Sequence, residues 1–214
     1  MKKIGFLFAA LALTVAANAQ EKTANEYKNE GNEFMKAKKY QQALESYEQA
    51  YAIKGDSLDL TTVYNAGYCA MKADAYDKAI TFFNKAEANA AKADACCYNA
   101  AQCLKKQEKT DEYVAALQAG IEKYKTGKYN VQMKKELTKY YRDKALASYN
   151  EATEVTKQFA ANVANQDKLD ELKAEAKAKC EEALPNLEKA LEVSPTDAAC
   201  SQVKSAIEKL MSTL

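Results

Sequence analysis

The residues best suited to chemistry in this 214-residue chain are its six cysteines. A zinc site or a thioredoxin-like redox centre would call for histidines or a Cys-x-x-Cys pair, but the chain has no histidine and no such spacing. In an oxidising compartment cysteines pair as disulfides, and within helices they pack as small buried residues. Both interpretations stay open, with a thiol-active protein as a third, because pairing cannot be deduced from sequence. The cysteines are Cys69, Cys96, Cys97, Cys103, Cys180 and Cys200.

Motifs for enzyme chemistry are missing as well. The chain has no Gly-rich phosphate loop, no Gly-x-Ser-x-Gly elbow and no dinucleotide-binding fingerprint, and without histidine it lacks the commonest general base. Acidic pairs occur at Asp170-Glu171 and Glu181-Glu182, but they alternate with lysine as on a solvated helix face. The sequence therefore predicts a protein that is not an enzyme and that uses neither a cofactor nor a metal ion.

The first residues have the pattern of a secretory signal peptide. A charged Met-Lys-Lys start precedes an apolar run from Ile4 to Ala17, and a small-x-small triplet ends at Ala19. The run is shorter than the ~20 residues that a spanning helix needs, which favours cleavage after Ala19 over a membrane anchor. Gln20, rather than a cysteine, follows and argues against a lipid anchor. We expect residues 1–19 to be removed and the rest to be periplasmic or secreted, without membrane insertion, as for a Gram-negative bacterial signal.

The charge of the exported chain is nearly balanced. Loss of the leader leaves 29 of the 31 Lys and Arg residues against 30 Asp and Glu, a net charge near −1. Nucleic-acid binding calls for a basic surface, so a nucleic-acid partner is not expected. Six glycines and two prolines among abundant Ala, Glu and Lys predict an all-α protein.

An apolar pattern with helical spacing repeats along the first half of the chain. Residues 27–50 carry apolar and small side chains on one face of two helices, with a turn near Lys38-Lys39. The pattern returns after 36 residues at Val63–Ala86 and, less regularly, after a further 34. In the first copy its positions are Tyr27, Gly31, Phe34, Tyr40, Ala43, Leu44, Tyr47 and Ala50.

The spacing Tyr-x3-Gly-x2-Phe followed by Tyr-x2-Ala-x3-Tyr-x2-Ala resembles the tetratricopeptide repeat (TPR), a helix-turn-helix unit of roughly 34 residues. The third copy is degenerate, because Tyr113 stands where the family has Ala and Ala101 replaces the Gly that lets helices approach closely. Gly120 is expected to relieve that crowding. The resemblance implies an α-α superhelix of about three to four helix pairs, with the first three in residues 20–128.

Beyond residue 128 the repeat period breaks. Residues from Tyr129 to about Asn165 contain neither Gly nor Pro, and their apolar residues recur every three to four positions, as in one long helix. A second apolar stripe follows the reversal, over residues 169–187. We prefer a long antiparallel hairpin, packed like a short coiled coil, to a single solvated helix because the two stripes can cover each other. With a capping helix from Ala198 to Met211, it forms an enlarged fourth unit, residues 129–214.

In this family the first helices of successive repeats line a concave groove that binds extended peptides, and the resemblance assigns side chains to it. The carboxylate-clamp subset offers Lys and Asn in its first repeat and Asn in its second, which Lys28, Asn32 and Asn65 match. Asn99 occupies the groove position in the third repeat that Asn65 occupies in the second, and it is a further candidate. The clamp's third repeat, however, offers Lys and Arg where this chain has Ala95 and Asn99, so two of the five clamp residues are missing. A lysine also lies at the end of the first helix of each repeat. These three lysines, Lys36, Lys72 and Lys106, form a ladder of further candidate binding residues.

Two functions follow from these features. The favoured one is an exported scaffold that binds a protein or peptide through the groove, the hairpin or both, using amides for a peptide backbone and ammonium groups for a carboxylate. A merely polar inner face, with lysines that suit helix C-termini, is the other interpretation of the groove residues. The alternative function is a self-associating structural component of the cell envelope, a homo-oligomer held by the hairpin's apolar stripe.

Overall fold

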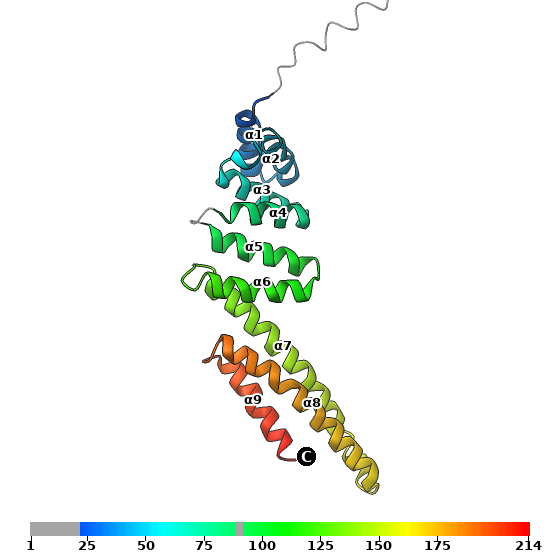
Figure 1. The fold of residues 1–214 in the computed structure, drawn as a ribbon. Coiled ribbons are helices and arrows are strands. Elements are labelled where there is room, and N and C mark those ends of the chain that lie inside the picture. The colour runs from blue at the N-terminus through cyan, green and yellow to red at the C-terminus, as the bar shows by residue number, and fades with distance from the viewer. Residues whose placement is uncertain (1–21, 89–91) are drawn as a thin grey trace, which may run out of the picture. The chain divides into compact units, whose positions relative to one another are not determined.

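The computed structural model describes residues 22–88 and 92–214, and every regular element in these residues is a helix (Figure 1). The predicted signal peptide, residues 1–19, lies outside the described residues. The chain divides into two compact units, one ending at Phe82 and one beginning at Phe83. None of the described helices is both long and apolar enough to span a membrane.

The first unit is built from short helices joined by tight turns. Thr23 begins α1 with a capping box: its hydroxyl accepts the backbone N–H of Glu26, and the Glu26 carboxylate accepts the backbone N–H of Thr23. A Cβ at Gly31 would lie 2.7 Å from the Tyr47 ring, so the glycine lets α1 and α2 approach closely. The helices are α1 (Ala24–Lys36), α2 (Tyr40–Lys54), the 3-10 turn η1 (Gly55–Ser57), α3 (Leu60–Lys72) and α4 (Tyr76–Ala86), which continues past the division.

The first helix of each of three successive pairs ends in the same turn. Lys38, Asp74 and Glu108 lie in the left-handed region, with φ of 57°, 58° and 59°. Their spacing of 36 and 34 residues is the predicted repeat period. In each turn the next N–H bonds to a carbonyl five residues earlier, which is the Schellman arrangement. These bonds run from Lys39 to Phe34 (2.9 Å), from Ala75 to Ala70 (2.9 Å) and from Lys109 to Leu104 (3.1 Å).

The second unit combines one ordinary helix pair with a long hairpin and a closing helix. Helix α5 packs on α6, α6 on α7, and α8 on both α7 and α9. Its main core joins all of these helices, and its largest fully buried members include Leu117, Met133, Leu137, Leu187 and Ile207. The elements are α5 (Ala93–Lys106), α6 (Thr110–Lys123), α7 (Asn130–Thr156), the 3-10 turn η2 (Ala160–Asn162), α8 (Gln166–Val193) and α9 (Ala198–Met211).

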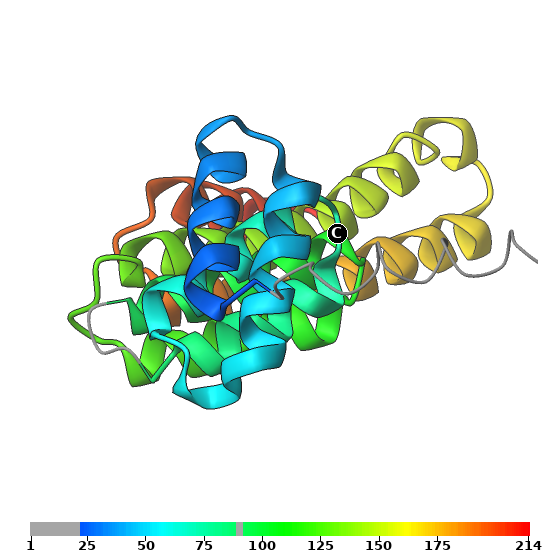
Figure 2. The same ribbon diagram turned by 90° about the horizontal axis from the view of Figure 1, so that it is seen from above.

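Helices α7 and α8 form the predicted antiparallel hairpin, and α9 has the predicted bounds of the capping helix (Figures 1 and 2). The distal part of the hairpin has its own small core, to which both arms contribute. Val155 comes from α7, and Leu172 and Ala176 come from α8. The two apolar stripes thus cover each other, as expected.

The first arm of the hairpin ends sooner than the sequence indicated. Helix α7 stops at Thr156 rather than near Asn165, because the intervening residues make the reversal, including the 3-10 turn η2. The side chain of Asn165 accepts the N–H of Lys168 at 3.1 Å and so caps α8. Val163 is an apolar residue of the segment from Tyr129 to Asn165 that was predicted to be one helix, but it is 67% exposed because it lies in this reversal.

The third repeat accommodates its irregular residues by specific contacts. Tyr113 is buried, and its hydroxyl donates to Glu136 on α7 at 2.7 Å. Gly120 relieves crowding as predicted, since a Cβ there would lie 2.6 Å from Met133 Sδ and 2.7 Å from Cys97 Sγ. The bulky tyrosine thus has a hydrogen-bond acceptor on α7, and Gly120 makes room for Met133 and Cys97.

Candidate functional site

The first predicted groove residue, Lys28, is held by an ion pair within the first unit. Its ammonium lies 2.8 Å from Asp59 Oδ2. Asp59 is also the N-cap of α3, because its carboxylate accepts the backbone N–H of Thr62 at 2.9 Å and the Thr62 hydroxyl at 2.8 Å. Burial opposes ionisation, but Lys28 and Thr62 together hold the pKa of the Asp59 carboxyl below its ordinary value.

The structure brings Asn32 and Asn65 together through a buried phenol. The Tyr47 hydroxyl donates to Asn32 Oδ1 at 2.8 Å. The side chain of Asn65 acts on the same phenol and lowers its pKa, against the larger effect of burial. Tyr47 is fully buried on α2, and this burial raises the pKa of its phenol. The Asn32 amide N–H groups donate to no described residue, so they remain available for a peptide carbonyl.

The lysine ladder has two members in the first unit and one in the second. Lys36 pairs with Glu33 of its own helix at 3.0 Å, and the Lys72 ammonium lies 5.5 Å from the centre of the Tyr68 ring. Lys106 is exposed at the last residue of α5. These contacts stay within one helix, as expected for lysines at helix C-termini, and they leave the ammonium groups at the surface.

Asn99 lies half-buried on α5, in the second unit. Ala95, at the place where a clamp would have lysine, is buried on the same helix. An alanine there brings no charge to the inner face.

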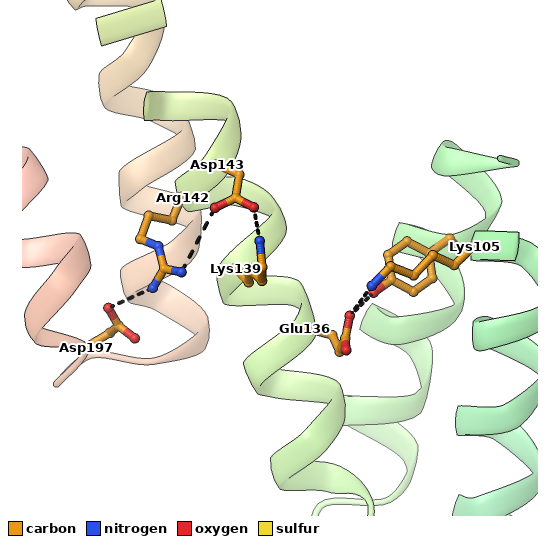
Figure 3. A network of polar contacts seen from close by, with 7 residues as sticks. Lys105, Glu136, Lys139, Arg142, Asp143 and Asp197 are labelled. Carbon is orange, nitrogen blue, oxygen red and sulfur yellow. Dashed lines mark hydrogen bonds and ion pairs between the residues drawn. The ribbon is translucent and has the colours of Figure 1, made fainter. Parts of the chain in front are cut away.

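A chain of polar contacts joins α5, α6 and α7 in the second unit. The Lys105 ammonium lies 2.6 Å from Glu136 Oε2, which also accepts the Tyr113 hydroxyl (Figure 3). Burial alone would raise the pKa of the Glu136 carboxyl, but the hydrogen bonds from Lys105 and Tyr113 hold it below its ordinary value. Burial and the bond to Glu136 raise the pKa of the Tyr113 phenol. Glu136 is thus charged and already satisfied by its neighbours.

A second set of charges lies further along α7 and reaches the start of α9. Arg142 lies between two carboxylates, 3.8 Å from Asp197 Oδ1 and 4.0 Å from Asp143 Oδ1 (Figure 3). Lys139 pairs with Asp143, one turn along the same helix. Asp197 is the N-cap of α9, and the Cys200 N–H that it accepts at 2.8 Å lowers the pKa of its carboxyl.

Sequence reasoning missed this cationic set on α7. Its signal was present, because Lys134, Lys135, Lys139 and Arg142 follow one another at steps that keep them near one helix face. Arg142 is also the only arginine in the sequence. The apolar period of this segment predicts its helix but not this set of cations.

The cysteines show no sign of a reactive or metal-binding centre. All six are free thiols, and all but the half-buried Cys97 are buried. Burial raises the pKa of Cys69 and of Cys103 to about 12. Within residues 22–88 and 92–214 no three His, Cys, Asp or Glu side chains gather to hold a metal ion.

Comparisons with known proteins point to one fold. A TPR repeat protein of Bacteroides fragilis aligns over 87% of this chain and 98% of its own, with 22% identity and a TM-score of 0.53. YrrB, a TPR protein with an unusual peptide-binding site, aligns over 92% and 100% with 22% identity and a TM-score of 0.41. The TPR2AB domain of yeast Sti1, in complex with pHSP90, aligns over 87% and 83% with 18% identity and a TM-score of 0.41. No family model and no curated protein matches the chain.

Proposed function

The chain has the all-α fold of the tetratricopeptide-repeat proteins, and from this premise we propose that it is a non-enzymatic scaffold that binds a protein or an extended peptide. The observation that carries the proposal is the Asn32 amide, whose oxygen is held by the hydroxyl of Tyr47, with Asn65 acting on the same phenol. Fixed amides lose little conformational freedom when they bind a peptide backbone. Lys28, Lys36 and Lys72 add positive charge to the same unit. Within the second unit, Asn99 and Lys106 are the proposed binding residues.

Binding in cells can be tested by crosslinking the mature protein and identifying what it captures by mass spectrometry. We expect a protein partner whose yield falls several-fold in a variant carrying Asn32→Ala and Asn65→Ala. The matched control is Gln41→Ala with Gln42→Ala, which changes two exposed amides on α2. Capture of no partner by the wild type would contradict the scaffold, and equal capture by both variants would move the site away from Asn32 and Asn65.

We also propose that the scaffold works outside the cytoplasm, in the periplasm or beyond the cell. The support is the sequence of residues 1–19, with its charged start, short apolar run and small residues before Gln20. Expression in a Gram-negative host should give a mature protein that begins at Gln20, as intact mass and N-terminal sequencing would show. A full-length chain that stays in the cytoplasmic fraction would refute export.

Self-association through the hairpin is the second candidate. Little of the apolar stripe is left for a second copy to cover, because the stripes of α7 and α8 cover each other within one chain. Val163, 67% exposed in the reversal, is the apolar residue still available there. Light scattering across a concentration series decides the matter: a dimer that Val163→Lys dissociates would support this candidate, and a monomer at all concentrations would exclude it.

A further inference from the structure

The strongest candidate ligand site outside the predicted groove is a pocket beside α7. Its walls come from one face of α7 and from the segment that links α8 to α9, and its volume is about 310 Å³. This is near the lower end of the range for small-ligand sites, roughly 300–1,000 Å³. The Thr138 and Ser194 hydroxyls are hydrogen-bonded to each other at 2.8 Å and tie the two walls together. The pocket is therefore built by tertiary contacts within the second unit.

The charge of this pocket is strongly positive. The only lining carboxylate is that of Asp197. Four other lining side chains are cations on α7, namely Lys134, Lys135, Lys139 and Arg142. Lys134 and Lys135 form no ion pair with any residue in the described part of the chain. In a chain whose charges nearly balance, this concentration marks a local attraction for anions.

Arg142 is the residue in this pocket with the most unused binding capacity. Its side chain is only 24% exposed, yet its contacts with Asp197 and Asp143 are 3.8 and 4.0 Å long. Hydrogen bonds to a carboxylate are shorter, roughly 2.7–3.2 Å, so the two acids orient the guanidinium by charge without taking up its N–H groups. Arg142 donates no hydrogen bond within the described residues. A mostly buried fork of donors is thus left for a ligand.

We propose that this pocket binds an acidic segment of a protein partner, with Arg142 holding a carboxylate of that segment through paired hydrogen bonds. The planar guanidinium matches the geometry of a carboxylate, and Lys135 and Lys139 lie beside it on the same helix. This inference rests on the proposed scaffold function and names the chemistry of the partner. It places the contact on α7, in the second unit, whereas Lys28, Asn32 and Asn65 belong to the first.

Two features favour an acidic peptide over a nucleic acid or a polyphosphate. Val131, 70% exposed at one end of the lining, offers an apolar contact for a neighbouring peptide side chain. Asp197 and Asp143 beside Arg142 would repel a densely charged phosphate chain, whereas one carboxylate can fit between the cations. The ligand chemistry is therefore carboxylate with an apolar neighbour.

The test measures fluorescence anisotropy of a short labelled peptide that alternates glutamate and leucine, added to the mature protein. We expect saturable binding that weakens with added salt and is lost when glutamine replaces each glutamate. Arg142→Gln should weaken binding about tenfold or more, since hydrogen bonds to charged groups are the strong ones. Arg142→Lys should recover only part of it, because lysine cannot form the paired contact.

Two further variants keep the result independent of folding. Lys135→Gln changes an exposed lysine of the pocket, and it should weaken binding while leaving the thermal transition unchanged. Lys177→Gln removes an exposed lysine on α8 outside the pocket and should leave binding intact. The proposal would be overturned if the peptide bound equally well to the wild type, Arg142→Gln and Lys135→Gln. It would also be overturned if a labelled single-stranded DNA bound the wild type more tightly than the peptide does.

The same variants separate this inference from the scaffold itself. If the wild type captures a partner in cells and Arg142→Gln captures it equally, the pocket is not the site and the scaffold stands. If the wild type captures no partner, the scaffold fails whatever the pocket binds. Loss of capture by Arg142→Gln, with Lys177→Gln unaffected, supports both.

Discussion

The ammonium of Lys28 on α1 lies 2.8 Å from Oδ2 of Asp59, and Asp59 is the N-cap of α3, the first helix of the second pair. A lysine that matches the clamp pattern by sequence is therefore also a link between successive helix pairs. A ligand carboxylate at this place would have to compete with Asp59 for the same charge. The first unit thus offers the amide of Asn32, oriented by Tyr47, more readily than its lysine.

The link between Lys28 and Asp59 predicts unequal costs for removing its partners. Asp59→Ala removes the cap as well as the ion pair and should destabilise the protein by about 1 kcal/mol, within a range of roughly 0.5–2. Lys28→Met removes only a largely exposed pair and should cost less than about 1 kcal/mol. Urea unfolding measures both. Asp59→Asn is the control, because asparagine caps a helix about as well as aspartate; a cost equal to that of Asp59→Ala would show that the cap is not what matters.

The left-handed residues Lys38 and Glu108 predict stabilising glycine substitutions. The left-handed region costs an L-residue about 1–2 kcal/mol, and a glycine avoids this cost but gains freedom in the unfolded chain worth about 0.4–1 kcal/mol. Lys38→Gly and Glu108→Gly should therefore each stabilise the protein by about 0.5–1 kcal/mol in urea unfolding. Lys106→Gly, two residues before Glu108 and at the end of α5, should instead destabilise it, by up to about 1 kcal/mol. Destabilisation by all three would contradict the turn geometry.

These turns show what the sequence could and could not predict. The apolar period locates the turn near Lys38 and sets its spacing to the next two, because each helix must bury one face. It does not predict the left-handed residue, since no glycine marks the position. Asn32 was expected in a groove, but its bond to Tyr47 was missed because tyrosine was interpreted there as an apolar residue.

The pocket beside α7 was missed for a different reason. Its second wall includes Ser194, whose hydroxyl is hydrogen-bonded to that of Thr138, 56 residues earlier in the chain. A periodic pattern reports which face of a helix is buried, but it does not report which distant loop returns to cover the other side. The hairpin that brings Ser194 back was predictable from its two apolar stripes. The partner of each polar residue along it was not.

Glu136 predicts a pH dependence of stability. Its folded pKa lies below the ordinary value of 4.5, so its contribution is present above about pH 4.5 and is lost as the pH falls through the folded pKa. Glu136→Gln should be less stable than wild type by about 1–2 kcal/mol at pH 7, and this difference should shrink as the pH falls below 4.5 and through the folded pKa. Glu122→Gln, at a glutamate whose side chain is 76% exposed, is the control and should change little at either pH. A pH-independent difference for Glu136→Gln would refute the assignment.

The free thiols predict a chain that oxidises and alkylates slowly while it is folded. Burial raises the pKa of Cys96 to about 12 and that of Cys200 to about 11, and the thiolate is the reactive form. Thiol titration without reductant should find little rapid reaction in the native protein and six thiols after unfolding in urea. The half-buried Cys97 should react first, so Cys97→Ser should remove the fastest phase. Fewer than six thiols after unfolding would reveal a disulfide, and rapid native reaction at several cysteines would reopen a role for them in chemistry.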